Sequence, residues 1–196
     1  MDFYFPKVKD INLSELKISD IGKYSISKPI DATIINNIIL SYFPIGSKIT
    51  ITDCCANNGG NTINFALKFY KVNSVEINKD EFDILSHNVK TYKLKNVKLI
   101  HDDYLNQMML LKQDVVFIDA PWVGTQYFRK KNLDLYLGEM NIIDIVKKLY
   151  DKNAFKLCVL KVPKNYNFNN LFNWSNEKFN IHTLNKFIII CLYLDN

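Results

Sequence analysis

Four acidic residues stand where apolar runs of this sequence end, and they are the first candidates for chemistry. Asp53 ends the run KITIT, Glu76 ends VNSV, Asp103 lies just beyond VKLIH, and Asp119 ends DVVFI. A carboxylate at such a place can accept hydrogen bonds from the hydroxyl and amine groups of a ligand. If the runs are strands of one parallel sheet, the four side chains gather at its carboxyl edge, where ligands of such sheets bind.

A turn rich in asparagine and glycine follows the first carboxylate. It reads NNGGNT from Asn57 to Thr62 and leads directly into a helical pattern. Glycine lets the backbone approach a ligand closely, while Asn57 and Asn58 tolerate left-handed conformations and offer side-chain hydrogen bonds. Glu76 follows about twenty residues later, the spacing at which an acidic residue binds a ribose diol in dinucleotide-binding sheets. The pattern therefore favours an adenosyl ligand.

Two common nucleotide-binding motifs are absent from the sequence. It contains no G-x-G-x-x-G, which a Rossmann dehydrogenase uses for a pyrophosphate, and no G-x-x-x-x-G-K-[ST] of the nucleotide triphosphatases. A glycine turn taken alone can also be a tight connection between a strand and a helix. The four polar strand ends together carry the prediction of a binding site.

The segments that position these residues alternate between strand and helix patterns. We expect helices within residues 28–43, over Thr62–Tyr70, from the N-cap Asn78 to about residue 91, and after the N-cap Asn141. Strands are expected at residues 48–53, 72–78, 97–101, 114–121 and 155–163. Nearly continuous apolar strands that alternate with helices indicate a parallel sheet covered on both faces.

The last two strands require a reversal. Residues 178–184 and 186–194 are joined by a connection too short for a crossover, so they form an antiparallel hairpin. We therefore expect an α/β fold, a Rossmann-like, mostly parallel seven-stranded sheet with a C-terminal antiparallel strand and helices on both faces. Residues 25–196 are predicted to form one domain, and the pattern assigns no structure to residues 1–24.

Composition limits the class of protein. The chain has 196 residues, 48% of them hydrophobic, and no apolar run reaches the roughly 18 to 20 residues of a membrane span. No secretory signal pattern opens the chain, so we expect an intracellular protein, cytoplasmic or nuclear, without a membrane partner. Its net charge of +5 fits an anionic partner. The four cysteines lack metal-type spacing, so no metal site is expected.

The segments DCCANNGGNTINFA, VEIN, HDDY, FIDAPWVG and the final reversed strand resemble a class I S-adenosylmethionine-dependent methyltransferase. More narrowly, they resemble the trimethylguanosine synthase family, which methylates the exocyclic N2 amine of 7-methylguanosine RNA caps. Its first motif reads like D-x-x-x-G-x-G-G-N-T-I-x-F-A and its fourth like [DS]-P-P-W-G-G. YSISKP and LKVPKN are similar to two further segments of that family. Asn58, Ala120 and Val123 stand where the family has glycine, proline and glycine.

The resemblance implies S-adenosylmethionine as cofactor and capped RNA, or a cap-like guanosine nucleotide, as substrate. It implies a catalytic group in which Asp119 and the Ala120 carbonyl accept the amine hydrogens, Pro121 fixes the loop and Trp122 stacks on the base. Trp122 could instead be a core or lid aromatic. The implied cofactor residues are Asp53, Asn57, Asn58, Gly59, Gly60, Asn61, Thr62, Glu76, Ile77, Asp103 and Tyr104, with Asp102 competing with Asp103 for the adenine amine.

Candidate substrate residues lie in three separate segments. They are Ser25 and Ser27 in YSISKP, Arg129 and Lys130 in a basic and aromatic loop, and Lys161 at the end of the fifth strand. Interleaved basic and aromatic groups suit phosphates and bases, although the loop could also be an ordinary solvated surface.

Two alternatives stay open. A ribose 2′-O-methyltransferase could use Asp119 with Lys161, and with Lys28 upstream, to activate a hydroxyl. A catalytically degenerate methyltransferase fold could instead only bind RNA or a partner subunit.

Overall fold

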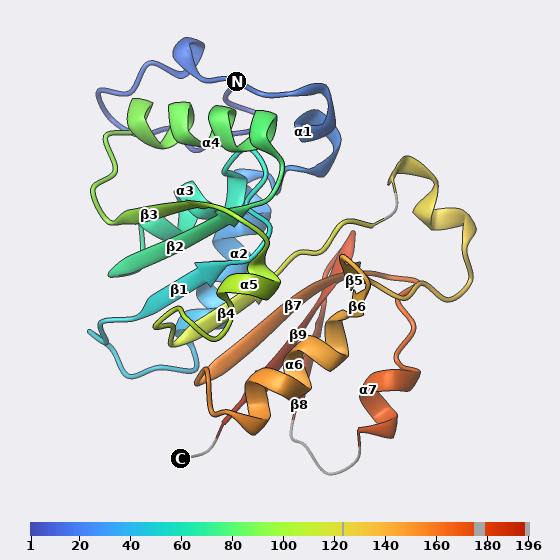
Figure 1. The fold of residues 1–196 in the computed structure, drawn as a ribbon. Helices are drawn as coiled ribbons and strands as arrows, with labels where there is room; N and C mark the ends of the chain where they lie inside the picture. Colours follow the sequence, from blue (N-terminus) through green and yellow to red (C-terminus); the bar gives the residue numbers. More distant parts are fainter. Residues whose placement is uncertain (123, 175–178, 195–196) are drawn as a thin grey trace.

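A seven-stranded sheet forms the centre of the molecule (Figure 1). The computed structural model describes residues 1–122, 124–174 and 179–194, so Val123 and Lys178 lie outside the described residues. The strands of the sheet are β1 (Thr50–Asp53), β2 (Lys71–Glu76), β3 (Val97–His101), β4 (Val115–Ile118), β7 (Leu157–Pro163), β8 (Phe179–Thr183) and β9 (Phe187–Tyr193). A separate two-stranded hairpin comprises β5 (Tyr136–Leu137) and β6 (Met140–Asn141).

The strand order across the sheet is β3-β2-β1-β4-β7-β9-β8. Strand β9 pairs antiparallel with β7 and with β8, whereas the pairs among β1, β2, β3, β4 and β7 are parallel. The predicted seven-stranded sheet with one reversed C-terminal strand is therefore confirmed. The order reverses between β1 and β4, which is the switch point where ligands of open sheets bind.

Helices cover both faces of the sheet. They are α1 (Asp20–Ser25), α2 (Pro29–Leu40), α3 (Gly60–Ala66), α4 (Lys79–Thr91), α5 (Tyr104–Gln107), α6 (Ile142–Asp151) and α7 (Asn169–Asn173), with the 3-10 helices η1 (Leu13–Glu15) and η2 (Gly124–Arg129). Apolar residues of α2 and α3 share one core with the sheet, and those of α5, α6 and α7 share the other. No helix in the described ranges is long and apolar enough to cross a membrane.

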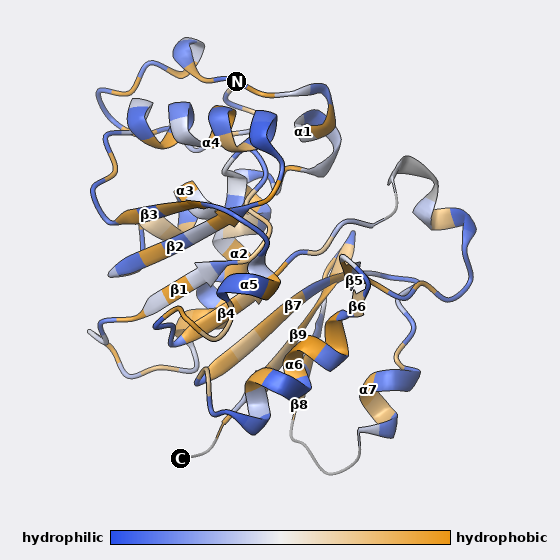
Figure 2. Cartoon of the chain, viewed as in Figure 1, coloured by the Kyte–Doolittle hydropathy of each residue, from blue (hydrophilic) through white to orange (hydrophobic). Residues whose placement is uncertain are grey.

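The alternation of side chains along the strands separates these two cores. In β4, Val115 and Phe117 belong to the core with α2 and α3, while Val116 and Ile118 belong to the core with α6. Strands β4, β7 and β9 are hydrophobic over most of their length (Figure 2), as expected of strands buried on both faces. Polar residues at their carboxyl ends are therefore the exceptions that need explaining.

The predicted helix starts at Asn78 and Asn141 are confirmed, since each side chain caps the helix that follows. The predicted bounds of the glycine-turn helix are wrong, because α3 begins at Gly60 and ends at Ala66. The Asn96 amide donates to the carbonyls of Ala66 and Phe69, and the chain then turns into β2. A capped turn therefore replaces the last predicted helical turn.

The N-terminal segment, residues 1–24, packs against α3 and α4. Phe5 and Leu16 form a small apolar cluster with Ile63 of α3 and with Tyr92, which follows α4. The Tyr92 hydroxyl donates to the carbonyl of Pro6 at 2.5 Å. The segment thus crosses the outside of these helices and delivers residues 25–28 to the carboxyl edge of the sheet (Figure 1).

Candidate active site at the carboxyl edge of the sheet

Three ionisable side chains continue one face of the sheet at its carboxyl edge. Asp53 follows Ile51, Asp119 follows Phe117 and Lys161 follows Val159, each two residues beyond a member of the core with α2 and α3. Side chains two apart on a strand share a face, so the three groups point toward the side on which α3 begins. The switch point and α3 together position this cluster.

A polar cluster joins β4, β7 and the segment before α2. The Lys161 ammonium donates to Asp119 Oδ2 at 2.7 Å and to Ser27 Oγ at 2.8 Å. The Asn61 amide lies 3.5 Å from the same Asp119 oxygen. Sequence reasoning proposed all four residues for the site, and the structure brings these four together.

The asparagine–glycine turn has two left-handed positions. Asn57 has φ 48° and Gly59 has φ 96°, and α3 starts at the next residue. A Cβ on Gly60 would lie 2.8 Å from the Ser27 carbonyl and would clash with Ile26 Cγ1. The close approach that Gly60 permits is therefore to the protein's own residues 26 and 27.

Asn58 differs from its predicted backbone role. Its φ is not positive, and its side chain is fully buried. Its oxygen accepts from the Ser19 amide at 2.9 Å, and its nitrogen donates to Glu81 of α4. Asn58 thus joins the N-terminal segment to α4, and only Asn57 uses the left-handed conformation that asparagine tolerates.

Glu76 ends β2 with its carboxylate turned back over the turn. Oε2 accepts from the Asn57 amide at 2.7 Å, and Oε1 accepts from the Asn78 amide at 2.8 Å. Each carboxylate oxygen can accept a second hydrogen bond, so both can still bind hydroxyl groups. Ile77, the next residue, is 64% exposed and offers an apolar surface beside that carboxylate.

The end of β3 distinguishes the two adjacent aspartates. Asp102 accepts from the Asp103 amide, Asn106 and Gln107, and these hydrogen bonds lower the pKa of its carboxyl. Asp103 Oδ1 caps α5 through the Leu105 amide. The Tyr104 side chain is buried in the core with α6, where burial raises the pKa of its hydroxyl. Among the described residues, both carboxylate oxygens of Asp102 thus accept hydrogen bonds, whereas Asp103 accepts only at Oδ1, and the Tyr104 ring packs in the core with α6.

Asp53 is fully buried behind the turn. Its Oδ2 accepts from the Thr62 hydroxyl at 2.7 Å, and Thr62 also contacts Ser74. Burial raises the pKa of Asp53 to about 7, against the lowering effect of the Thr62 hydrogen bond, and the charges of Asp119 and Glu76 raise it further. A cationic ligand group near this carboxylate would favour its charged form.

Unpartnered buried atoms gather at this edge. Among the described residues, they include the Oδ1 atoms of Asp53, Asn57 and Asn61 and the indole nitrogen of Trp122. A buried polar atom without a partner is costly unless a ligand or water satisfies it. Three of these atoms are acceptors, which fits a ligand rich in donors and positive charge. S-adenosylmethionine, with its ammonium, sulfonium and ribose hydroxyl groups, is such a ligand.

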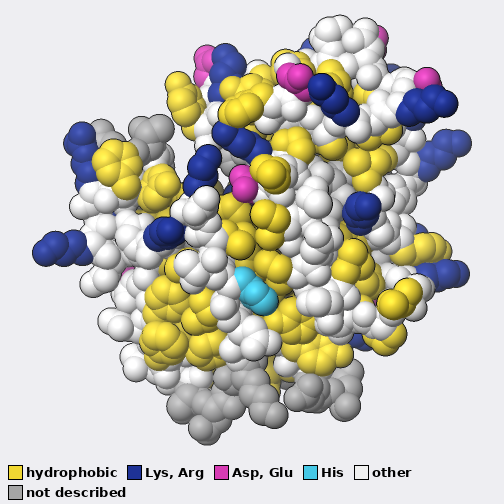
Figure 3. Space-filling model, turned by 180° about the vertical axis from the view of Figure 1, so that it is seen from behind, with side chains coloured by type: hydrophobic (Ala, Val, Ile, Leu, Met, Phe, Trp, Pro, Cys, Tyr) yellow, Lys and Arg dark blue, Asp and Glu magenta, His cyan; other side chains and the backbone are white. Residues whose placement is uncertain are grey.

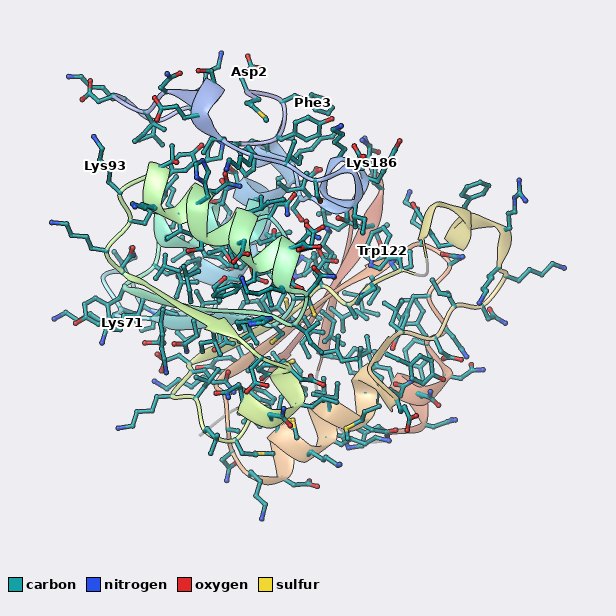
Figure 4. The ribbon with its side chains drawn as sticks, turned by 45° about the horizontal axis from the view of Figure 1, so that its top comes forward. Asp2, Phe3, Lys71, Lys93, Trp122 and Lys186 are labelled. Carbon is teal, nitrogen blue, oxygen red and sulfur yellow. The ribbon has the colours of Figure 1, made fainter. Side chains whose placement is uncertain are left out.

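Trp122 lies where the chain leaves β4 for η2 (Figure 4). Its half-buried indole contacts both cores, the Tyr127 ring meets it edge-on at 5.1 Å, and the Lys161 ammonium lies over it at 5.3 Å from the centroid. Ala120 is buried, and Pro121 is exposed. The predicted catalytic segment is therefore held in place by packing on both sides.

The other predicted substrate residues lie outside the polar cluster. The Ser25 hydroxyl donates to the Ile21 carbonyl within α1, and Arg129 and Lys130 are exposed at the end of η2. Asn165 donates to the carbonyls of Tyr127 and Lys130 and fixes that loop to the end of β7. Sequence reasoning missed Asn165. Its position just after the end of a predicted strand was the signal that could have identified it.

No group of three or more His, Cys, Asp or Glu in the described ranges could hold a metal ion. Burial raises the pKa of all four cysteine thiols, so they stay protonated at neutral pH.

Two known sequences are similar to this chain over most of its length. An uncharacterized protein of Acanthamoeba polyphaga mimivirus is 33% identical, over 94% of this chain and 80% of that protein. The trimethylguanosine synthase of Saccharomyces cerevisiae is 25% identical, over 82% of this chain and 52% of the yeast protein. The chain thus spans about half the length of the yeast relative.

Comparisons with solved structures and with family models both match this chain to methyltransferases. A crystal structure of a putative methyltransferase from Porphyromonas gingivalis superposes with a TM-score of 0.69 at 13% identity, covering 91% of this chain and 43% of that one. This likeness shows the methyltransferase fold. The family model of RNA cap guanine-N2 methyltransferases matches residues 48–191. The chain therefore belongs to the RNA cap guanine-N2 methyltransferase family.

Proposed function

We propose that this protein methylates the exocyclic N2 amine of 7-methylguanosine at the cap of an RNA. The observation that carries the proposal is the placement of Asp119–Trp122 at the switch point, beside the turn whose unpartnered acceptors suit S-adenosylmethionine. S-adenosylmethionine supplies the methyl group, and its transfer to the amine nitrogen leaves S-adenosylhomocysteine and releases one amine proton.

Asp119 orients the amine. Its Oδ2 is held by Lys161 and Asn61, while Oδ1 takes part in no hydrogen bond within the described ranges. Oδ1 and the Ala120 carbonyl would accept the two amine hydrogens and turn the nitrogen lone pair, which is delocalised into the ring, toward the methyl group. Such positioning can remove several kcal/mol of barrier, roughly 7 to 11 in the best cases.

Trp122 recognises the base. Since Lys161 lies over the indole, the base would stack on the opposite face, with Pro121 fixing the loop. Methylation at N7 gives guanine a delocalised positive charge, and an indole face attracts a cation by roughly 2 kcal/mol when the contact is desolvated. Neutral guanine lacks this contribution, so the methylated cap is the preferred substrate.

Competition binding with a 7-methylguanosine cap analogue and an unmethylated analogue tests this recognition. With S-adenosylhomocysteine present, we expect a preference of about thirtyfold for the methylated analogue, because each 1.4 kcal/mol is about a factor of ten. Trp122→Ala should remove most of the preference and Trp122→Phe part of it, while Trp174→Phe, outside the site, serves as control. Equal affinity of the wild-type protein for both analogues would refute cap recognition.

The RNA body would cross the basic loop that follows Trp122. Arg129, Lys130 and Lys131 are exposed there beside the exposed ring of Phe128. The protein carries a net charge of +5, and basic side chains outnumber acidic ones on the face seen in Figure 3. Basic and aromatic groups together bind phosphates and unpaired bases.

The ion pair of Asp119 with Lys161 gives specific support to ribose 2′-O-methylation as a second candidate. A lysine beside a carboxylate could activate a hydroxyl. However, the third group of that arrangement, Lys28, has its ammonium over the Phe3 ring, 3.7 Å from the centroid. A methyl group found on ribose would establish this candidate, and the absence of turnover with measurable cofactor binding would instead indicate a degenerate binding subunit.

A further inference from the structure

Strand β7 breaks its own pattern at one position. Leu157 and Val159 face the core with α2 and α3, and Lys161 is next on that face. Its side chain is only 7% exposed. A lysine is almost never fully buried unless it is paired, so the position calls for a specific partner.

The surroundings of Lys161 enclose its charge. The ammonium contacts Asp119 Oδ2 at 2.7 Å and Ser27 Oγ at 2.8 Å. The rings of Trp122 and Phe187 lie 5.3 and 5.2 Å away, measured to their centroids. The ammonium therefore touches both ends of the Asp119–Trp122 segment and the segment before α2. With these contacts the Lys161 ammonium is turned away from the solvent, where RNA would lie.

We propose that Lys161 is a positioning residue that fixes the Asp119 carboxylate for the methyl transfer, rather than a group that binds RNA. This inference rests on the proposed function. Lys161 and Asn61 hold Oδ2, which sets the plane of the carboxylate and directs Oδ1 toward the amine. Because the pair is buried, loss of either partner leaves an uncompensated charge, whereas loss of both does not.

Kinetics of five variants test this role. With a 7-methylguanosine cap analogue, Lys161→Met should lower kcat at least about tenfold while KM and the cofactor Kd change by less than about twofold. Lys161→Arg should recover part of the rate. In the Asp119→Asn background, Lys161→Met should change kcat by less than about threefold, because both substitutions then act on the same interaction. Lys164→Met, an exposed lysine three residues away, is the control.

Independent effects of Lys161→Met and Asp119→Asn would overturn the proposal, as would a rise in KM with unchanged kcat. The double variant also guards against misfolding, since it buries no unpaired charge. A second measurement needs no activity: NMR of protein labelled at lysine nitrogen should show one protected ammonium signal that Asp119→Asn removes. Absence of cap turnover in the wild-type protein would refute the proposed function alone, whereas a protected signal unaffected by Asp119→Asn would refute the Lys161 contact.

Discussion

Asp53 and Glu76 are two buried carboxylates at the same edge, and their partners give them different properties. Both oxygens of Glu76 accept backbone amides, whereas Asp53 has one oxygen with the Thr62 hydroxyl and one without a partner among the described residues. Burial therefore raises the pKa of Asp53 to about 7. In the proposed cofactor site, Glu76 would accept hydrogen bonds from ribose hydroxyl groups, and Asp53 would lie near a positive charge of the ligand.

Asp53 predicts a pH dependence of stability. Its pKa is raised on folding from 3.8 to about 7, so between these values the folded protein holds a proton that the unfolded chain releases. The free energy of unfolding should therefore fall as pH rises through this range, by roughly 2 to 3 kcal/mol between pH 5 and 8. Urea unfolding at both pH values measures it. Asp53→Asn should flatten the profile and Asp83→Asn, an exposed control, should not; equal slopes in wild type and Asp53→Asn would contradict the argument.

Glu76 predicts a loss of cofactor affinity. Each hydrogen bond from a ribose hydroxyl to this charged acceptor should contribute about 1.5 to 3 kcal/mol. Glu76→Ala should thus weaken S-adenosylmethionine binding at least about tenfold by calorimetry. Asp80→Ala, on the exposed first turn of α4, is the control. Unchanged affinity in Glu76→Ala would place the ribose elsewhere.

At the scale of elements, the start of α3 and residues 26–27 are packed together by Gly60. A Cβ there would press on Ile26 and on the Ser27 carbonyl, and Ser27 contacts Lys161. Gly60→Ala should cost about 1 to 3 kcal/mol of stability. It should also lower activity, because it displaces the polar cluster that contains Ser27 and Lys161. Gly46→Ala is the matched control, since Gly46 has φ 85° with open space around it and should lose stability, about 1 kcal/mol, without losing activity. Thermal unfolding measures the stability of both variants, and turnover measures their activity. A Gly60→Ala variant with full activity would contradict the predicted effect of Gly60 on the cluster.

Periodicity and caps predicted the large elements well, because β4, β7 and β9 are nearly continuous apolar runs and Asn78 and Asn141 cap the helices that follow. Short elements such as α5, α7 and the β5–β6 hairpin carry too few residues for a periodic signal. The end of α3 depended on Asn96, thirty residues beyond Ala66, whose amide caps it. Contacts that distant leave no local pattern.

In the site, too, local patterns were predictable from the sequence and contacts between distant segments were not. The acidic strand ends were predictable because parallel strands bring their carboxyl ends to one edge. The Asn58 contacts with Ser19 and Glu81, and the contact of Lys161 with Ser27, join segments far apart in sequence. A lysine in an apolar strand signalled an unusual position, but only the fold identified its partners.

At the scale of the whole molecule, three parts of the chain build the proposed catalytic cluster. The N-terminal segment delivers Ser27, the switch point between β1 and β4 places Asn61 against Asp119, and β7 contributes Lys161. The basic loop anchored by Asn165 lies directly after this cluster. The proposed cofactor turn, cap site and RNA surface would thus follow one another along one edge of the sheet.

Mapping of the transferred methyl group tests the central claim most directly. The protein is incubated with methyl-labelled S-adenosylmethionine and one RNA carrying either a 7-methylguanosine cap, an unmethylated cap or no cap, and the digested product is analysed by mass spectrometry. The account predicts that the label appears on the N2 amine of the 7-methylguanosine, with little incorporation into the other two RNAs. Label on a ribose hydroxyl, or equal labelling of capped and uncapped RNA, would contradict it.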